Sequence, residues 1–244
     1  MKTTQTLFAA LILGTSLFTA TSAQAALVPA LNGQVVNDTD LNITWLANAN
    51  LAATNSFGLS YGVNYGNDAY GYPSVIYNYG AMTWGGAQKW IGAMNAANYL
   101  GYHDWRLPTT LQPDASCGTQ FGGDSYGYNC TGSEMGHLFY SELGAVAGSS
   151  ILTTHNTNLA LFQNVQSYYY WSGTEYAPDT TSAWLFNPGN GGQGAGYKGN
   201  PLFALAVRPG QVAAAAVPEP GTTWLLGLGL LGLAGVARRR LVLR

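Results

Sequence analysis

The amino-acid sequence predicts an α+β fold in which two helices are followed by short, mostly antiparallel strands, with many loops. Apolar residues recur every three or four positions over residues 83–100, which is the spacing of an amphipathic helix. A second stripe with this spacing begins near Ser133. Beyond Leu161 the chain shows short strand-like runs separated by Asn/Gly-rich turns. Helices followed by a run of strands are typical of the α+β class.

Local signals at their ends support both helices. The first is expected to end at Gly101, because glycine readily takes the left-handed conformation that ends many helices. Thr131 and Glu134 have the spacing of a capping box at the start of the second helix. The apolar stripe of the first helix is Ala87, Trp90, Ile91, Met94 and Ala97, and that of the second is Met135, Leu138, Phe139, Leu143 and Val146.

The strand signals are shorter. Residues 42–46 predict an early strand, whereas the Gly/Tyr/Asn stretch at 55–80 predicts loops and short strands. Later strands are predicted at residues 168–171, 182–186 and 203–207. Apolar neighbours place three tryptophans in the expected core, namely Trp84, Trp105 and Trp171.

The composition excludes some classes of function. The chain has 244 residues, of which 8% are charged, with 9 Lys+Arg and 11 Asp+Glu. Nucleic-acid binding needs a basic face, so no nucleic-acid partner is expected. Aromatic residues make up 13% of the chain, which argues against disorder. The sequence therefore predicts an ordered, loop-rich globular domain.

The N-terminus has the pattern of a secretory signal peptide. Lys2 precedes an apolar run at residues 7–18, and Ala23-Gln24-Ala25 forms an A-x-A cleavage site. We expect residues 1–25 to be this signal, cut after Ala25. A membrane anchor is the alternative, but the apolar run is short and no stop-transfer charge follows it.

The C-terminus carries three elements in a fixed order. Pro218, Glu219 and Pro220 precede an apolar stretch at residues 221–237, which is expected to form a transmembrane helix, and the cluster Arg238, Arg239 and Arg240 follows. Residues 217–244 resemble the PEP-CTERM sorting signal of Gram-negative bacteria. The resemblance implies that the secretion machinery and an exosortase are partners of this protein. It also implies transient anchoring in the inner membrane, removal of the tail by the exosortase, and delivery to the cell surface or extracellular matrix. A permanent tail anchor is the alternative.

Between these ends, residues 26–216 suit a single domain. Its four cations stand against ten carboxylates, so its net charge is about −6 and phosphate or anionic lipid is not an expected ligand. Cys117 and Cys130 are its only cysteines, and in an oxidising compartment they should form a disulfide. A two-cysteine metal site is the alternative, although no histidine lies close by in the sequence.

Three patches of this domain resemble the Lcl C-terminal domain family of bacterial surface proteins. They are Leu41-Asn42-Ile43-Thr44-Trp45-Leu46 with the four residues after it, Asp104-Trp105-Arg106-Leu107-Pro108-Thr109, and residues 170–176, followed by Ala183-Trp184 and Ala206-Val207-Arg208. The resemblance implies a C-type-lectin-like fold and a role in adhesion and glycan contact rather than catalysis. We therefore expect a role in adhesion or in the biofilm matrix. The segment 110–132 departs from the family pattern, so its role is not implied by the resemblance.

The expected ligand site is the loop at residues 187–193 and its surroundings. An aromatic ring beneath a sugar and amide or carboxylate hydrogen bonds to its hydroxyls are the groups that bind carbohydrate, and both kinds occur here. The candidate residues are Tyr176, Asp179, Trp184, Asn187, Asn190, Gln193 and Lys198. The alternative is an ordinary solvated turn.

Metal and enzyme signals are weak. Gln112-Pro113-Asp114 is similar to the calcium tripeptide of C-type lectins, but the downstream Trp-Asn-Asp is missing, so no metal and no cofactor are predicted and Ca²⁺ stays an unsupported possibility. No H-E-x-x-H or G-x-S-x-G motif accompanies the histidines, which are His103, His137 and His155.

The sequence thus predicts an exported, non-catalytic protein that binds extracellular polysaccharide. Arg106 and Arg208 are expected to pair with carboxylates such as Glu175 or Asp104 rather than with ligand. One alternative is a structural matrix protein without a discrete ligand site. The other is a glycan-active enzyme, whose acidic pair would come from Glu134, Glu142 and Glu175.

Overall fold

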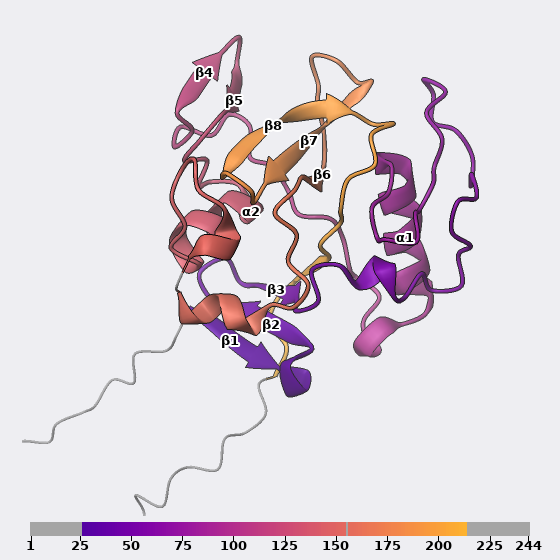
Figure 1. Ribbon diagram of the computed structural model, residues 1–244, viewed down its shortest axis with the longest axis horizontal. Coiled ribbons are helices and arrows are strands. Elements are labelled where there is room, and N and C mark those ends of the chain that lie inside the picture. The colour runs from indigo at the N-terminus through magenta and orange to yellow at the C-terminus, as the bar shows by residue number, and fades with distance from the viewer. Residues whose placement is uncertain (1–25, 155, 214–244) are drawn as a thin grey trace, which may run out of the picture.

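The computed structural model describes residues 26–154 and 156–213 (Figure 1). In this part of the chain the strands form three small antiparallel sheets. The largest has the order β1-β2-β3-β9, so the last strand pairs with the third. Its members are β1 (Leu27–Ala30), β2 (Val35–Asp38), β3 (Ile43–Leu46) and β9 (Val207–Pro209).

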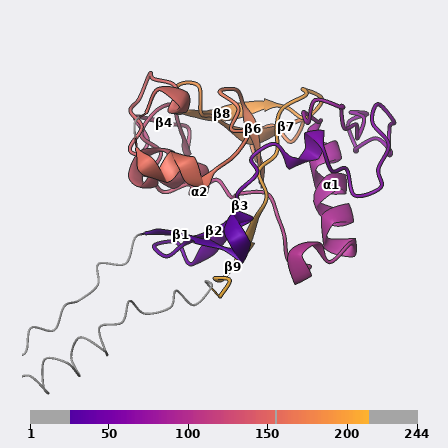
Figure 2. The same ribbon diagram turned by 60° about the horizontal axis from the view of Figure 1, so that its bottom comes forward.

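The other two sheets belong to the middle and the end of the chain. One is a hairpin of β4 (Thr119–Phe121) and β5 (Asp124–Tyr126). The other has the order β6-β7-β8, with β6 (Tyr170–Glu175), β7 (Ser182–Asn187) and β8 (Gly192–Tyr197). Figure 2 shows this sheet on the opposite side of the molecule from the four-stranded sheet, with the helical segments to either side.

One helix has ordinary length. The α1 helix (Trp84–Ala96) is capped by the Thr83 hydroxyl, which accepts a hydrogen bond from the Gly86 N–H at 3.2 Å. The α2 helix (Glu134–His137) has a single α-turn and continues as a π-helical turn, Leu138–Glu142. Short 3₁₀ turns lie at Leu31–Gly33, Leu51–Ala53, Tyr99–Gly101, Ile151–Thr153 and Thr157–Leu161.

The predicted two-helix, C-type-lectin-like α+β class is wrong. The described residues form mainly strands in three small antiparallel sheets, with one helix of ordinary length beside them. The capping box does not form, because the Glu134 carboxylate binds Arg106 instead of capping the helix. The second segment then widens into its π-turn and ends before Gly144, whose φ is +60°. Val146, expected in its apolar stripe, is 61% exposed.

The predicted strands agree with the structure in part. The runs at 42–46 and 182–186 are confirmed as β3 and β7, and the run at 168–171 begins later, as β6. In the run at 203–207, Phe203 forms an isolated bridge with Tyr170, residues 204–206 are buried outside any strand, and β9 begins only at Val207. Strand β8 was not predicted, because its glycines indicate a turn rather than a strand.

The core forms around large aromatic side chains. Trp45, Trp90 and Trp171 are fully buried. The predicted core positions of Trp105 and Trp171 are confirmed, whereas Trp84 is half-buried and donates a hydrogen bond from Nε1 to the Ser172 carbonyl at 2.9 Å. The three fully buried indoles also donate from Nε1, to Asp38, to the Asn55 carbonyl and to the Met82 carbonyl respectively.

No helix among residues 26–154 and 156–213 is both long and apolar enough to cross a bilayer. The signal peptide predicted at residues 1–25 and the membrane helix predicted at 221–237 lie outside the described residues.

Arg208 fixes the last strand to the loop that follows α1. Its Nε and Nη2 atoms donate to the two Asp104 oxygens at 2.8 and 2.9 Å, and its guanidinium lies 4.0 Å from the centre of the Tyr102 ring. The predicted pairing of Arg208 with Asp104 is confirmed. The hydrogen bond from Arg208 lowers the pKa of Asp104 below its ordinary value of 3.8.

We predict that Asp104→Asn reduces the loss of stability in acid. Because the pKa of Asp104 is lower in the folded than in the unfolded chain, its ionised form stabilises the fold at neutral pH, and this contribution disappears as the pH falls through the folded-state pKa. Chemical denaturation at pH values from about 5 to about 2 should show a shallower decline for this variant than for wild type. Asp40→Asn, at an exposed carboxylate, is the control and should keep the wild-type slope. Parallel slopes for Asp104→Asn and wild type would contradict the prediction.

Candidate functional site

A groove lies along the sheet face formed by β7 and β8. Its volume is about 520 Å³. The strand register pairs Leu185 with Gly194 and Asn187 with Gly192, so these residues share one face of the sheet. The lining residues are Tyr168, Tyr169, Leu185, Asn187, Asn190, Gly192, Gln193, Gly194, Ala195, Gly196, Asn200, Pro201 and Leu202.

Alternation along β8 creates the floor of this groove. Gly192, Gly194 and Gly196 are every second residue of the strand and therefore point to one face. No heavy atom lies within 4 Å of the position that a Cβ on Gly194 would occupy. Because glycine has no side chain, the strand backbone and Leu185 form a shallow floor.

Tyrosine rings form part of the wall. Tyr168 is 51% exposed, and its ring packs edge-on against Tyr169 with a centroid distance of 5.0 Å. The Tyr168 ring also contacts Phe203 edge-on, at 6.5 Å between centroids. These contacts hold an exposed aromatic ring in place at low entropic cost.

The turn between β7 and β8 supplies amide groups. The side-chain oxygens of Asn187 and Asn190 accept hydrogen bonds at 2.8 Å from the Gly189 and Gly192 N–H groups. No side chain or carbonyl in the described part of the chain accepts a hydrogen bond from either NH₂ group. Both asparagines therefore keep donors for a ligand, with their orientation fixed by the turn.

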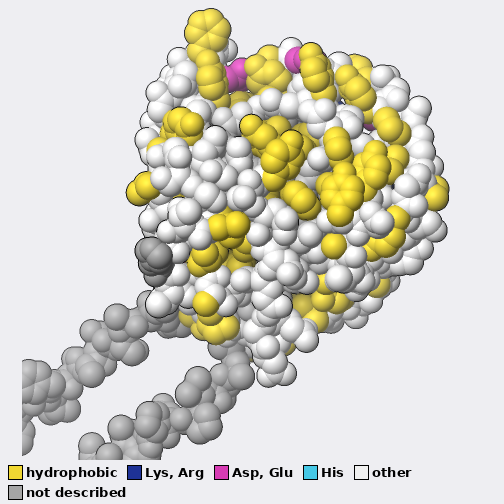
Figure 3. All heavy atoms as spheres, in the orientation of Figure 1, with side chains coloured by type: hydrophobic (Ala, Val, Ile, Leu, Met, Phe, Trp, Pro, Cys, Tyr) yellow, Lys and Arg dark blue, Asp and Glu magenta, His cyan; other side chains and the backbone are white. Residues whose placement is uncertain are grey.

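The groove is uncharged. None of its lining residues is Asp, Glu, Lys, Arg or His. Figure 3 shows hydrophobic side chains over much of one face of the molecule, with Asp or Glu side chains near its upper edge and no Lys or Arg in view. An uncharged groove suits a neutral ligand that offers hydroxyl groups.

Lys198 and Trp184, two of the predicted ligand residues, are buried and contact other side chains of the protein. Lys198 is 3% exposed, pairs with the Glu175 carboxylate, and places Nζ 4.5 Å from the centre of the Trp84 ring. Trp184 is also buried and packs edge-on against Tyr176, with 5.3 Å between ring centroids. In these positions both side chains support the β6-β7-β8 sheet.

Tyr176 and Asp179 lie beyond the groove lining. The Tyr176 hydroxyl donates to Asp124 Oδ2 at 2.9 Å, and this hydrogen bond raises the pKa of Tyr176. Asp179 Oδ1 accepts from the Thr181 N–H and hydroxyl at 3.1 and 2.7 Å. Of the seven predicted ligand residues, the structure brings Asn187, Asn190 and Gln193 together at the groove, and a ligand role for all seven stays a prediction.

Gln193 connects β8 to the loop that departs from the family pattern. Its backbone N–H and carbonyl pair with Gly127 at 2.7 and 2.9 Å. Its side chain is buried, and Nε2 donates to the Ser125 carbonyl at 3.3 Å and to Cys117 Sγ at 3.7 Å. The predicted Cys117–Cys130 disulfide is confirmed. The disulfide loop therefore supports β8 from the side of the sheet opposite the glycine floor.

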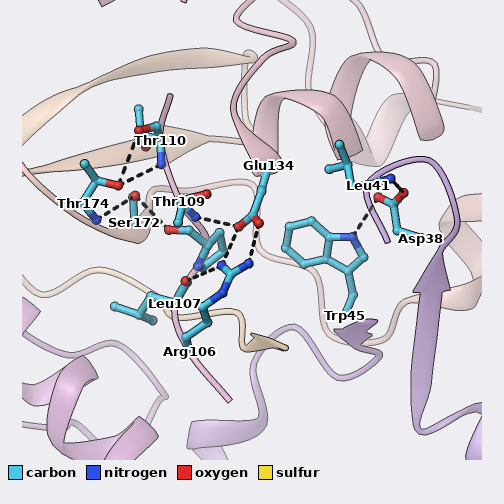
Figure 4. Close-up of polar contacts among 11 residues, drawn as sticks. Asp38, Leu41, Trp45, Arg106, Leu107, Thr109, Thr110, Glu134, Ser172 and Thr174 are labelled. Carbon is cyan, nitrogen blue, oxygen red and sulfur yellow. Dashed lines mark hydrogen bonds and ion pairs between the residues drawn. The ribbon is translucent and has the colours of Figure 1, made fainter. Parts of the chain in front are cut away.

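Two motif residues, Arg106 and Asp114, form contacts within the protein. Figure 4 shows Arg106 directed at Glu134; Nη1 lies 2.7 Å from Oε2 and Nη2 lies 2.6 Å from Oε1. Arg106 thus pairs with a carboxylate as expected, but with Glu134 rather than Glu175. Asp114 of the calcium-like tripeptide is buried and accepts hydrogen bonds from Ser116 and from the Gly132 N–H.

Glu134, Glu142 and Glu175, from which the acidic pair of an enzyme would come, each bind a different side chain. Glu134 binds Arg106, and Glu175 binds Lys198. Glu142 Oε1 lies 3.1 Å from His137 Nε2 in the interior. None of the three lines the groove.

Sequence reasoning missed the walls and floor of the groove, which are Tyr168, Tyr169, Asn200 and the glycines of β8. The available signal was Gly192-Gln193-Gly194-Ala195-Gly196, in which glycine recurs with the period of two that a strand requires. The tyrosines could not be assigned from sequence, because they reach the groove only through the fold.

We predict that Gln193→Ala destabilises the fold. The change removes the hydrogen bonds to Ser125 and Cys117 and leaves a cavity between β8 and the disulfide loop. Urea denaturation should show a decrease of about 1–3 kcal/mol in the free energy of unfolding. Asn190→Ala, which changes a partly exposed turn residue, is the comparison and should cost less. Equal stability of Gln193→Ala and wild type would refute this structural role.

Comparison with known families identifies the C-terminal segment. The model of the PEP-CTERM protein-sorting motif matches residues 216–240, which include the predicted Pro218-Glu219-Pro220 and Arg238-Arg239-Arg240. No family match supports the resemblance of residues 41–208 to the Lcl C-terminal domain family, and no curated protein matches the chain. The chain therefore carries a PEP-CTERM sorting signal, which marks an exported protein that an exosortase sorts to the cell surface.

Proposed function

We propose that this exported protein binds a neutral extracellular polysaccharide in the groove on β7 and β8, without catalysis. The observation that carries the proposal is the composition of the groove, which combines the exposed Tyr168 ring, fixed asparagine NH₂ donors and no charged residue. Its volume of about 520 Å³ falls in the range of small-ligand sites.

Each part of the groove suits a sugar chain. The apolar face of a pyranose ring packs on an aromatic ring, and Tyr168 offers one that its neighbours hold in place. The NH₂ groups of Asn187 and Asn190 can donate to sugar hydroxyl oxygens. The glycine floor allows a chain to approach the strand backbone closely.

The sorting signal and the groove support the following proposal for the site of action. We place the chain in a Gram-negative bacterium, with transient anchoring in the inner membrane through residues 221–237 before processing. The domain then acts at the cell surface or in the extracellular matrix, in adhesion or in the biofilm matrix. An uncharged groove on an acidic domain favours neutral over anionic polymers.

A structural matrix protein is the second candidate. Exposed aromatic side chains outside the groove favour it, among them Phe121 at the tip of the β4–β5 hairpin and Tyr79 in the 55–80 stretch. Such residues can mediate packing between chains without a discrete ligand site.

We predict that changes in the groove weaken glycan binding selectively. An array of neutral and anionic oligosaccharides, probed with the full chain, should give hits among the neutral ones. Tyr168→Ala should weaken binding to such a hit at least about tenfold, because it removes the exposed ring. Gly194→Leu should block binding, because it fills open space on the floor.

The matched control is Tyr79→Ala, since Tyr79 is 53% exposed, nearly the same as Tyr168, but lies outside the groove lining. This variant should bind like wild type. A blank array with folded protein, or equal losses for Tyr79→Ala and Tyr168→Ala, would favour the structural matrix protein.

We also predict that replacing Pro218, Glu219 and Pro220 with alanine prevents sorting. The variant should accumulate in the membrane fraction of a host that contains an exosortase, whereas wild type reaches the cell surface. Cell fractionation with immunoblotting measures both. Arg244→Ala, outside the matched residues 216–240, is the control and should be sorted normally. Normal surface delivery of the triple variant would contradict the prediction.

A further inference from the structure

Two buried carboxylates and one imidazole meet between β2 and the helical segment that follows α2. Asp38 ends β2, His137 ends α2, and Glu142 ends the π-turn. Asp38 is 0% and Glu142 is 4% exposed. One potential ligand atom from each of the three residues lies within 4.8 Å of the others.

The Asp38 carboxylate is held in a defined position. Oδ1 accepts from the Leu41 N–H at 3.0 Å, and Oδ2 accepts from Trp45 Nε1 at 3.2 Å, as Figure 4 shows. Trp45 is itself fully buried. Each carboxylate oxygen has a further lone pair, so these hydrogen bonds orient Asp38 without using all its acceptor capacity.

Glu142 is buried with only part of its hydrogen-bonding capacity used. Its Oε1 lies 3.1 Å from His137 Nε2, whereas no residue within 26–154 or 156–213 donates a hydrogen bond to Oε2. Burial, and after it the neighbouring Asp38 carboxylate, raise the pKa of Glu142. The second oxygen therefore keeps its acceptor capacity, on a side chain that is 3% exposed.

The described cations do not compensate this charge. Arg106, Lys198 and Arg208 pair with Glu134, Glu175 and Asp104, and Lys89 is exposed on α1. Asp40 adds further negative potential at Glu142. Buried carboxylates in proteins are normally paired with a cation or bound to a metal, and here two of them share one imidazole.

We propose that Asp38, His137 and Glu142 bind a divalent transition-metal cation of the Zn²⁺ class. Two carboxylate oxygens and one imidazole nitrogen are a mixed O/N set that such ions accept, whereas Ca²⁺ takes six to eight oxygens. The His137 side chain is 16% exposed, which provides a route for the ion. This proposal replaces the sequence-based prediction of no metal site and does not depend on the glycan groove.

A metal bound here would join two parts of the chain that are distant in sequence. Asp38 belongs to the four-stranded sheet, and His137 and Glu142 belong to the helical segment beside it. A bound cation would therefore fix the first sheet to the middle of the chain, and binding to the folded state alone stabilises that state.

Zn²⁺ titration of the full chain tests the site. The protein is purified without a polyhistidine tag, with its disulfide oxidised, and is stripped with chelator before calorimetry with ZnCl₂. We expect one Zn²⁺ per chain, and at least a tenfold loss of affinity in both His137→Ala and Glu142→Gln. His103→Ala is the matched control, because His103 is exposed and lies outside the cluster, and it should bind like wild type.

Near-UV circular dichroism of the metal-free variants checks folding. Glu142→Gln removes a buried charge while keeping the side-chain shape, so it is expected to fold and decides the test if His137→Ala does not. Absence of saturable Zn²⁺ binding, or wild-type affinity in a folded Glu142→Gln variant, would overturn the proposal. An equal loss in His103→Ala would overturn it too, because binding would then not be specific to this cluster.

Discussion

The bidentate ion pair between Arg106 and Glu134 is the contact on which the arrangement of the sheets depends. The Arg106 backbone pairs with Val207, the first residue of β9, at 2.8 and 2.9 Å, while its side chain holds the first residue of α2. Glu134 Oε2 also accepts from the Thr109 N–H at 2.7 Å. One side-chain pair therefore fixes the end of the four-stranded sheet, the loop after α1 and the start of the middle segment. Removing either partner would leave a partly buried charge without compensation.

Low charge shapes the rest of the molecule. Three of the four cations in the described residues are used in internal pairs, each with a different carboxylate. Few remain to form a charged surface, so the outer face of the β6-β7-β8 sheet is built from glycine, asparagine and tyrosine. The same scarcity leaves Asp38 and Glu142 with the His137 imidazole, and no Lys or Arg of the described residues, as a cationic partner. The uncharged groove and the uncompensated buried carboxylates thus have one compositional origin.

Local signals were sufficient where the interaction itself is local. Helix α1, the strands β3 and β7 and the disulfide between neighbouring loops follow from spacing and residue type. The sorting signal is also local, because its three elements are consecutive. The prediction of the second helix was wrong because Glu134 has two possible partners. Its carboxylate binds Arg106, which is distant in sequence, instead of the backbone N–H groups at the start of the helix. The sequence does not predict β8, because this strand is stabilised by pairing with β7 rather than by its own glycine-rich sequence.

The candidate site illustrates the same limit at the level of single side chains. In the sequence, the polar and aromatic residues near 187–193 are equally good candidates for ligand contact. The alternation of side chains along the strands places them on opposite faces of the sheet. Side chains of one parity, such as those of Trp184 and Phe186, are buried, whereas Asn187 and the β8 glycines face the groove. The register between β7 and β8 decides which residues can meet a ligand, and a shift by one residue would reverse that choice. The backbone hydrogen bonds between Gln193 and Gly127 restrain this register. A contact with the disulfide loop therefore helps to determine which residues of β8 are open to a ligand.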